Sequence, residues 1–375
     1  MMERVARVAA ELTSAPDAPT YHHLLPQSYI RRWAPDRKGS IRSVRIADGR
    51  WKLVGPRKVG GIDDFYRLDA DDIDDSRTPP LVIEVLLGEL DKLASTWIDQ
   101  FLAVEPGPIT DDGLKFDMAL VVGAQMMRGE SFRQEQLALL EYAAQQDPIE
   151  HSKHAARIWL GMTGQLIDDE TVALTAAQMR EKDRQSLISQ DSKAQAIQLM
   201  MQNWTSAVMP LVARNWAIYR ADTPLLTSDN PVVIVGGPSA DRRIKPGYVP
   251  APEWVYPIDR YRLLTCFRPD IQPRFPFVLD ETETFEINRE IVAAAYEMVF
   301  QHPDDDIAST IKVPPWPVVP KAESVVDLSR RPTRWLNDPN PPAPPVSRWY
   351  SMDVPPNRSS SLKGASSSAA IRSCQ

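Results

Sequence analysis

Strand-like segments lie on both sides of a long helical stretch in this 375-residue chain, and this order limits the folds that it can adopt. Residues 41–46 and 51–54 alternate around Asp48-Gly49, which is typical of a β-hairpin. Further short β-rich segments, separated by proline or glycine, cover 216–219, 225–227, 232–235, 254–258 and 262–267. The order predicts an α+β fold in which N-terminal and C-terminal segments share an antiparallel sheet.

Helical periodicity fills the middle of the chain. Apolar residues follow helical spacing from Leu81 to Leu102, and Thr110 then resembles an N-cap with Asp111 and Asp112 in the first turn. The pattern predicts one long helix from there to about Gln146. Further helices are expected over 149–160, 171–186, 192–212 and 284–300, and we expect the central ones to pack as a bundle.

Composition divides the chain into three parts. Residues 1–20 have no recognisable pattern and are expected to be flexible, whereas 21–313 are expected to form a single α+β domain. Residues 314–375 are rich in proline and then in serine, so they are predicted to be largely disordered. Trp316, Trp335 and Trp349 leave an alternative open, because tryptophans in such a tail can anchor it to the folded body or to a partner.

Charge and cysteine content exclude several classes of protein. A net charge of -7 argues against a surface built to attract phosphate; a nucleic-acid partner is neither implied nor excluded. The two cysteines, Cys266 and Cys374, are too few for a disulfide framework or a thiolate cluster. No segment reaches the roughly 20 apolar residues of a membrane span, and no signal peptide is evident. We therefore expect a soluble cytoplasmic protein without a membrane partner.

The first candidate site is the segment HHLLPQSYIRRWA at 22–34, where two of the five histidines are adjacent. Pro26 is suited to the first turn of a helix, which places His22 and His23 just before a helix N-terminus. The positive end of a helix favours neutral imidazole, which can act as a general base or a metal ligand. Equally, one histidine could cap the helix while the other pairs with a carboxylate in the core.

The second candidate is the turn Thr227-Ser228-Asp229-Asn230-Pro231, which joins two apolar segments. Small polar residues before a proline form turns by bonding their own backbone, and that role alone explains the composition. If the turn lies at the edge of the core, Asp229 could orient a histidine or act as a base, with Ser228 and Asn230 as donors.

The third candidate is Gln125 and Arg128, which share one face of the long predicted helix. Apolar neighbours at 119–122 indicate that this face is buried, and a buried arginine requires a partner or an anionic ligand. A structural ion pair with an acid such as Glu130 or Asp229 explains it equally well.

These segments, in this order, resemble the DUF4238 family, a bacterial domain of unknown function. The resemblance covers roughly 21–313, leaves out the tail, and departs from the family at Gly129-Glu130, where Thr-Pro or similar is expected. It implies that the three candidate sites belong to one ensemble, although the family has no established activity. The matching segments are HHLLPQSYIRRWA, VGGIDDFYRLD, GAQMMRGESFR, NWAIYRADTPLLTSDNPVVIV, WVYPIDRYRLLT and INREIVAAAYEMVF.

The leading hypothesis is a hydrolytic enzyme that acts on an anionic substrate such as a phosphodiester. His22 or His23 and Asp229 would serve as base, orienting group or metal ligands, and Arg128 would bind the substrate. A divalent metal is an open alternative as cofactor. The competing hypothesis is a non-catalytic binding or structural module in which these residues lock the fold. The hydrolase requires His22 or His23, Asp229 and Arg128 to line a common pocket.

Overall fold

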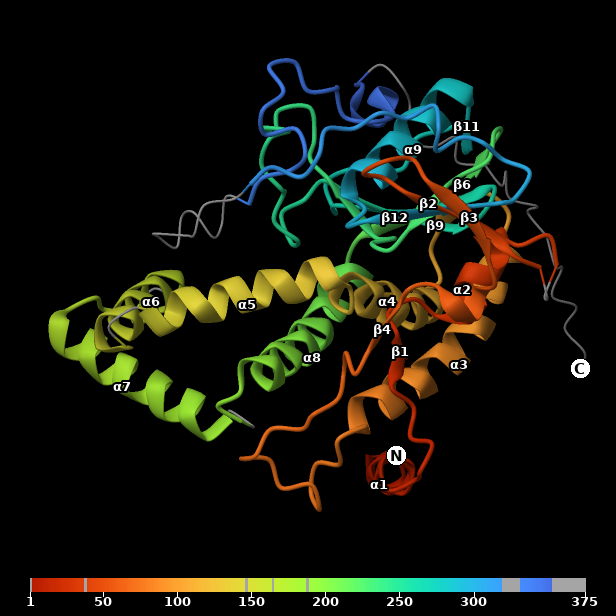
Figure 1. The fold of residues 1–375 in the computed structure, drawn as a ribbon. Coiled ribbons are helices and arrows are strands. Elements are labelled where there is room, and N and C mark those ends of the chain that lie inside the picture. The colour runs from red at the N-terminus through yellow and green to blue at the C-terminus, as the bar shows by residue number, and fades with distance from the viewer. Residues whose placement is uncertain are drawn as a thin grey trace, which may run out of the picture.

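The computed structural model describes residues 2–36, 39–145, 148–163, 165–186, 189–318 and 331–352. It has the α+β architecture expected from the sequence, with antiparallel sheets on one side of a group of helices (Figure 1).

The larger sheet is built from the β-rich segments after the helices. Its strands run in the order β11 (Val278–Leu279), β6 (Asn215–Ala221), β10 (Arg262–Phe267), β9 (Glu253–Asp259) and β8 (Val233–Val235). The short strand β5 (Gly107–Ile109) also pairs with β6. Neighbours are antiparallel except for β11 and β6.

The second sheet confirms that distant parts of the chain share strands. It joins the hairpin β3 (Trp51–Val54) and β2 (Ile41–Arg45) to β12 (Met298–Gln301) and then β7 (Thr227–Ser228). Gly49 has a φ of 69°, the conformation that the hairpin turn requires. A separate two-stranded pair joins β1 (Tyr21–His23) to β4 (Gly61–Asp63).

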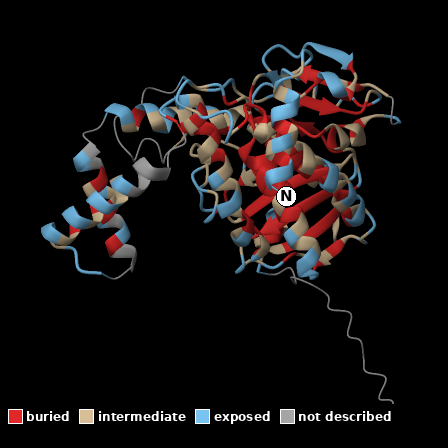
Figure 2. Cartoon of the chain, turned by 90° about the horizontal axis from the view of Figure 1, so that it is seen from below, coloured by how far each residue is buried: buried red, intermediate tan, exposed pale blue. Residues whose placement is uncertain are grey.

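Four long helices pack together below the sheets. They are α3 (Val82–Leu102), α4 (Asp112–Met127), α5 (Glu130–Gln145) and α8 (Ser192–Val212). Helices α6 (Pro148–Thr163) and α7 (Asp169–Ser186) pair with each other and project from the body in both views (Figures 1 and 2). Helix α1 (Met2–Thr13) packs against α3 with Val5 and Ala9 buried, although the sequence predicted no helix there.

Two hydrophobic cores cover the two faces of the larger sheet. Alternate residues of β6 point to opposite faces. Trp216 and Ile218 belong to the core that the sheet forms with the long helices. Ala217 and Tyr219 belong to the core on the other face. The second core includes Ile287 and Ile291 of α9 (Glu281–Ala294). Because both faces are covered, most strand residues of this sheet are buried (Figure 2).

The remaining helical elements are short turns of three or four residues. They are α2 (Gln27–Ile30), η1 (Arg31–Trp33), η2 (Pro56–Lys58) and η3 (Ser347–Tyr350).

The structure corrects three sequence-based boundaries. The predicted helix from Thr110 to Gln146 is two helices, broken at Arg128 and Gly129, where glycine is a poor helix former. Its N-cap is Asp111 rather than Thr110, because the Asp111 carboxylate accepts from the Gly113 and Leu114 N–H groups. The last predicted helix ends at Ala294, and 298–301 form β12 because two strands pair with that segment.

Part of the proline-rich C-terminal region packs on the body. Trp335 and Trp349 are buried, and the Trp316 Nε1–H donates to the Ala295 and Tyr296 carbonyl oxygens, 3.3 and 3.2 Å away. The tryptophan anchors left open by the sequence are therefore confirmed for 314–318 and 331–352. The prediction of disorder for 319–330 and 353–375 lies outside the described residues.

Candidate functional site

Arg128 is held at the end of α4 by groups of its own chain. Its guanidinium forms a bidentate ion pair with Asp91 of α3, with N···O distances of 2.7 and 3.2 Å. Nη2–H also donates to the His23 carbonyl oxygen, 2.6 Å away. Burial lowers the pKa of Arg128, but Asp91 and Tyr66 outweigh that effect and leave the pKa above its ordinary value. With a side chain only 2% exposed, Arg128 acts as a clamp between α3, α4 and β1.

The two histidines take different structural roles beside this clamp. His22 is buried, and its Nδ1 accepts from the Tyr66 N–H, 2.8 Å away. The Tyr66 hydroxyl donates in turn to the Arg128 carbonyl oxygen, 3.0 Å away. The half-buried His23 has its Nε2 3.1 Å from the Gln27 amide nitrogen. Burial lowers the pKa of both histidines, which favours the neutral imidazole expected from the sequence. We call His22, His23, Tyr66, Asp91 and Arg128 the motif cluster.

Asp229 holds the start of β12 in place. Its carboxylate accepts from three consecutive backbone N–H groups, those of Tyr296, Glu297 and Met298, each 2.7 Å away. Burial raises the pKa of Asp229 to about 6, against the lowering effect of these three donors. The side chain thereby fixes the end of α9 to the turn that precedes β8.

The other predicted residues are also engaged or enclosed. The Ser228 hydroxyl accepts from the Asn230 N–H, 3.2 Å away, as expected for a self-bonded turn. The Asn230 side-chain amide donates to the Ala294 carbonyl oxygen, 3.0 Å away. Gln125 is buried on α4, 2% exposed.

The predicted ensemble is brought together only in part. In β1, the His23 carbonyl oxygen accepts a hydrogen bond from Arg128. The backbone of Asp229 lies near Gly129, because a Cβ added to Gly129 would be 3.7 Å from the Asp229 carbonyl oxygen. Among the described residues, no contact joins the Asp229 carboxylate to either histidine or to the Arg128 guanidinium.

Within the described ranges, no group of three or more His, Cys, Asp or Glu side chains is arranged to hold a metal ion. None of the described helices combines the length and the apolar character needed to cross a bilayer.

A cavity of about 130 Å³ lies where α5, β8, α9 and the C-terminal region meet. Asn230 lines it and is the one predicted site residue that does so. Its apolar wall includes Met126, Phe132, Tyr248, Trp316 and Trp335, and its charged wall includes Glu135, Asp241, Arg242, Lys245, Glu290 and Arg331.

Two cations share one carboxylate in this charged wall. Lys245 Nζ donates to Glu135 Oε1, 2.6 Å away, and Arg331 lies 3.2 Å from the other oxygen. The Tyr248 hydroxyl also donates to Glu135, 3.2 Å away. Burial lowers the pKa of Lys245, but Tyr248 and Glu135 outweigh it and keep the pKa above its ordinary value. Lys245 therefore stays charged at neutral pH.

The second ion pair of the wall is buried. Arg242 pairs with Glu290 of α9, and their side chains are 10% and 7% exposed. Arg242 Nε–H has no hydrogen-bond partner among the described residues. The remaining acid of the wall, Asp241, accepts from the Arg243 N–H, 3.0 Å away.

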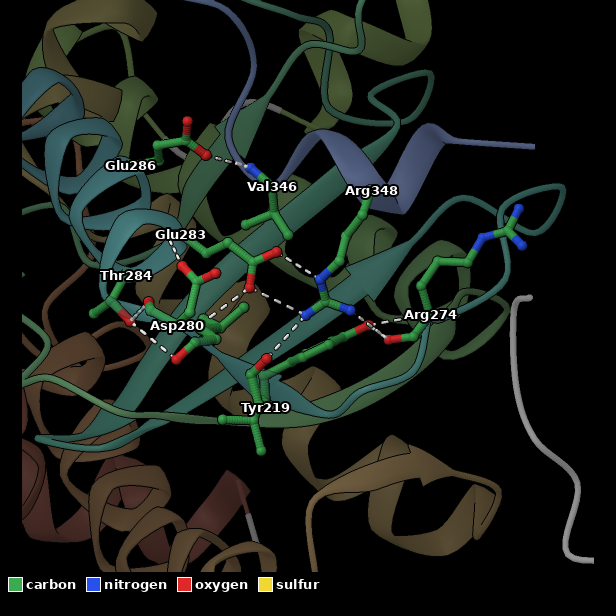
Figure 3. Close-up of polar contacts among 10 residues, drawn as sticks. Tyr219, Arg274, Asp280, Glu283, Thr284, Glu286, Val346 and Arg348 are labelled. Atoms are coloured by element: carbon green, nitrogen blue, oxygen red, sulfur yellow. Dashed lines mark hydrogen bonds and ion pairs between the residues drawn. The ribbon is translucent and has the colours of Figure 1, made fainter. Parts of the chain in front are cut away.

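The C-terminal region supplies one side of the cavity, and its far end is anchored to α9. Figure 3 shows Arg348 between the Glu283 carboxylate and the Arg274 carbonyl oxygen, beside Tyr219. The Val346 N–H donates to Glu286, 2.9 Å away. Nearer the cavity, Thr333 N–H and Lys245 N–H donate to the carbonyl oxygens of Arg243 and Arg331. The two cavity-lining segments thus hold each other in register.

Sequence reasoning missed the charged residues of this cavity. Lys245 and Arg331 lie in proline- and glycine-containing segments without periodicity, and Arg331 lies in the region predicted to be disordered. The tryptophans of that region were the one signal that it packs on the body.

Comparison with known proteins identifies the family. The sequence model of DUF4238, described as a protein of unknown function, matches residues 21–305, well over half of the chain. No curated protein and no solved structure matches the chain. This chain therefore belongs to the DUF4238 family.

Proposed function

We propose that this protein binds a small molecule in the cavity between α5, β8, α9 and the C-terminal region. In this proposal the polar residues of the family motifs hold the fold together and do not carry out a reaction. The observation that carries it is a partly open, mixed apolar and charged cavity built from parts of the chain that are far apart in sequence. Ligand sites are typically concave, largely apolar and supplied with a few polar groups.

The hydrolase predicted from the sequence is less well supported. It requires the Arg128 guanidinium for the substrate, yet Asp91 and the His23 carbonyl already accept its N–H groups. It also requires a free Asp229 carboxylate, which three backbone N–H groups occupy. The alternative in which these residues lock the fold explains the same contacts directly.

Ring-sized probes test the proposal, because an apolar cavity of about 150 Å³ accommodates benzene. We expect saturable binding of benzyl alcohol or benzoate by ligand-observed NMR. Ala294→Phe places a ring at a half-buried residue of the cavity wall and should abolish that binding. Ala173→Phe adds the same ring to an exposed position of α7 and should leave binding unchanged.

Two results would overturn the proposal. One is that neither probe binds the parent protein. The other is that a folded Ala294→Phe variant, checked by circular dichroism, binds as the parent does.

A further inference from the structure

The second sheet ends in a strand whose outer edge is exposed. The strand order places β3 at the end of this sheet, where, among the described residues, it pairs with β2 alone (Figure 1). Its first three residues are all exposed, and two of them are large and apolar: Trp51 is 55% exposed and Leu53 is 56% exposed. An exposed strand edge offers unpaired N–H and C=O groups to another chain.

The backbone of β3 turns the same two residues toward the free edge. The Arg45 N–H donates to the Arg50 carbonyl oxygen, 2.9 Å away, so this pair next to the turn is a hydrogen-bonded one. Hydrogen-bonded and non-hydrogen-bonded pairs alternate along an antiparallel ladder. Lys52 therefore bonds to β2, whereas Trp51 and Leu53 direct their N–H and C=O groups away from it.

The two faces of β3 differ in character. Successive side chains of a strand point to opposite faces, so Trp51 and Leu53 share one face and Lys52 lies on the other. The Arg42 guanidinium lies 4.2 Å from the centroid of the Trp51 ring and steadies that ring by a cation–π contact. A strand that pairs with this edge would meet apolar side chains on one face and a cation on the other.

The surroundings of the edge are basic. Residues 41–58 contain six Lys or Arg and one Asp, a net charge of +5, although the whole chain has a net charge of -7. Arg45 and Arg50 already pair with that Asp. Within the described structure, the exposed side chains of Lys52, Arg57 and Lys58 have no ion pair. Complementary charge therefore favours an acidic partner.

Two other occupants fit this edge less well. A second copy of β3 would bring the same cations together, and like charges on facing strands are destabilising. Nucleic acid has no amide backbone to pair with the free N–H and C=O groups. An extended acidic peptide supplies both the backbone and the charge.

We propose that β3 binds an extended acidic segment of a partner protein by β-strand addition. Apolar side chains of that segment would lie beside Trp51 and Leu53, and its carboxylates would lie beside Lys52. None of these three residues lines the cavity, so the partner protein and the small molecule occupy separate sites.

A capped hexapeptide of alternating valine and glutamate has the pattern that fits β3. We expect the labelled peptide to bind saturably in fluorescence anisotropy at low salt, and more weakly at high salt, because salt screens exposed charges. The same peptide with lysine in place of glutamate should bind at least about tenfold more weakly. N-methylation of the amides of the glutamate peptide removes its backbone donors and should abolish binding.

Variants assign the contacts to named residues. Lys52→Glu should reduce affinity for the glutamate peptide about tenfold and raise affinity for the lysine peptide by a similar factor. Lys92→Glu makes the same charge change on α3, at a side chain that is 73% exposed, and should change neither affinity more than about twofold. Trp51→Ala should weaken binding of both peptides, because it removes the apolar contact that they share. Circular dichroism checks that each variant is folded.

Several results would overturn this partner. One is that neither peptide binds, or that both bind equally well. Another is that Lys52→Glu leaves both affinities unchanged. Undiminished binding of the N-methylated peptide would exclude strand addition. Tighter binding of single-stranded oligodeoxythymidylate than of the glutamate peptide would make the basic edge a nucleic-acid site instead.

Discussion

The motif cluster and the cavity both place a cation beside a carboxylate, but they use it differently. Arg128 is 2% exposed, and Asp91, His23 and Tyr66 engage its guanidinium from three sides. Lys245 is 28% exposed and shares Glu135 with Arg331. A cation whose hydrogen-bond donors are engaged by the protein holds parts of the chain together, whereas a cation with donors to spare can bind a ligand. In our proposal the more conspicuous sequence motif is a structural clamp, and the candidate binding residues lie elsewhere.

The largest expected effect comes from breaking the clamp with Arg128→Met. Removing one partner of a buried ion pair leaves the other charge uncompensated, which costs about 3–5 kcal/mol of unfolding free energy. Urea unfolding measures that loss, and Arg220→Met at the exposed Arg220–Asp222 pair serves as control, with a loss below about 0.5 kcal/mol. A stable Arg128→Met protein would show that Arg128 is not a structural clamp and would make it a candidate ligand-binding residue.

Asp229→Ala tests whether the second motif is also structural. Three backbone N–H donors lose their acceptor, and we expect the free energy of unfolding to fall by about 2–3 kcal/mol. Hydrogen bonds to a charged group contribute most to stability, and in the variant water replaces part of them. Hydrogen exchange should show faster opening of 298–301, since β12 loses its fixed start. Asp229→Asn keeps one acceptor oxygen, so its stability should lie between those of the parent and of Asp229→Ala. Unaltered exchange in Asp229→Ala would contradict the structural role.

Glu253 of β9 is a buried acid near the cavity wall, and it predicts a dependence on pH. Burial raises the pKa of Glu253 to about 8, while Tyr350 and Arg242 lower it and Glu290 raises it. Because the folded pKa lies above the unfolded value of 4.5, the folded state binds the proton more tightly. Stability should therefore fall as pH rises between these values, by about 2 kcal/mol from pH 5.5 to pH 7.5.

Glu253→Gln isolates that contribution. The variant cannot ionise at this position, so the difference in unfolding free energy between parent and variant should grow with pH in favour of the variant. Glu286→Gln, which removes a half-buried acid of α9, is the matched control for the substitution itself. A parallel pH profile for parent and Glu253→Gln would show that Glu253 is ionised in the folded protein.

Local pattern was sufficient for most of the fold and for little of the candidate site. The helix predicted over 192–212 is α8 with the same bounds, because its apolar spacing and its N-cap Asp191 are local signals. Residues 298–301 continue the apolar spacing of a helix, yet they form β12, since β2, β7 and the Asp229 carboxylate supply partners from distant segments. The cavity depends still more on distant contacts. Its charged residues come together only when 331–333 pair with 243–245, and neither segment has a period that predicts this.

Glu135→Gln is the change for which we expect the smallest effect on stability. Glu135→Gln removes the one carboxylate that Lys245 and Arg331 share, but Gln can still accept hydrogen bonds at the same place. Because Glu135 is partly exposed at the cavity wall, the loss of unfolding free energy should stay near 1 kcal/mol. Benzoate affinity should rise about threefold, since the variant removes one negative charge from the cavity wall. The equivalent change in the motif cluster, Asp91→Asn, should destabilise the protein more and leave benzoate affinity unchanged. Isothermal titration with both variants measures this. Weaker benzoate binding by Glu135→Gln would mean that the carboxylate positions Lys245 for the ligand rather than competing with it.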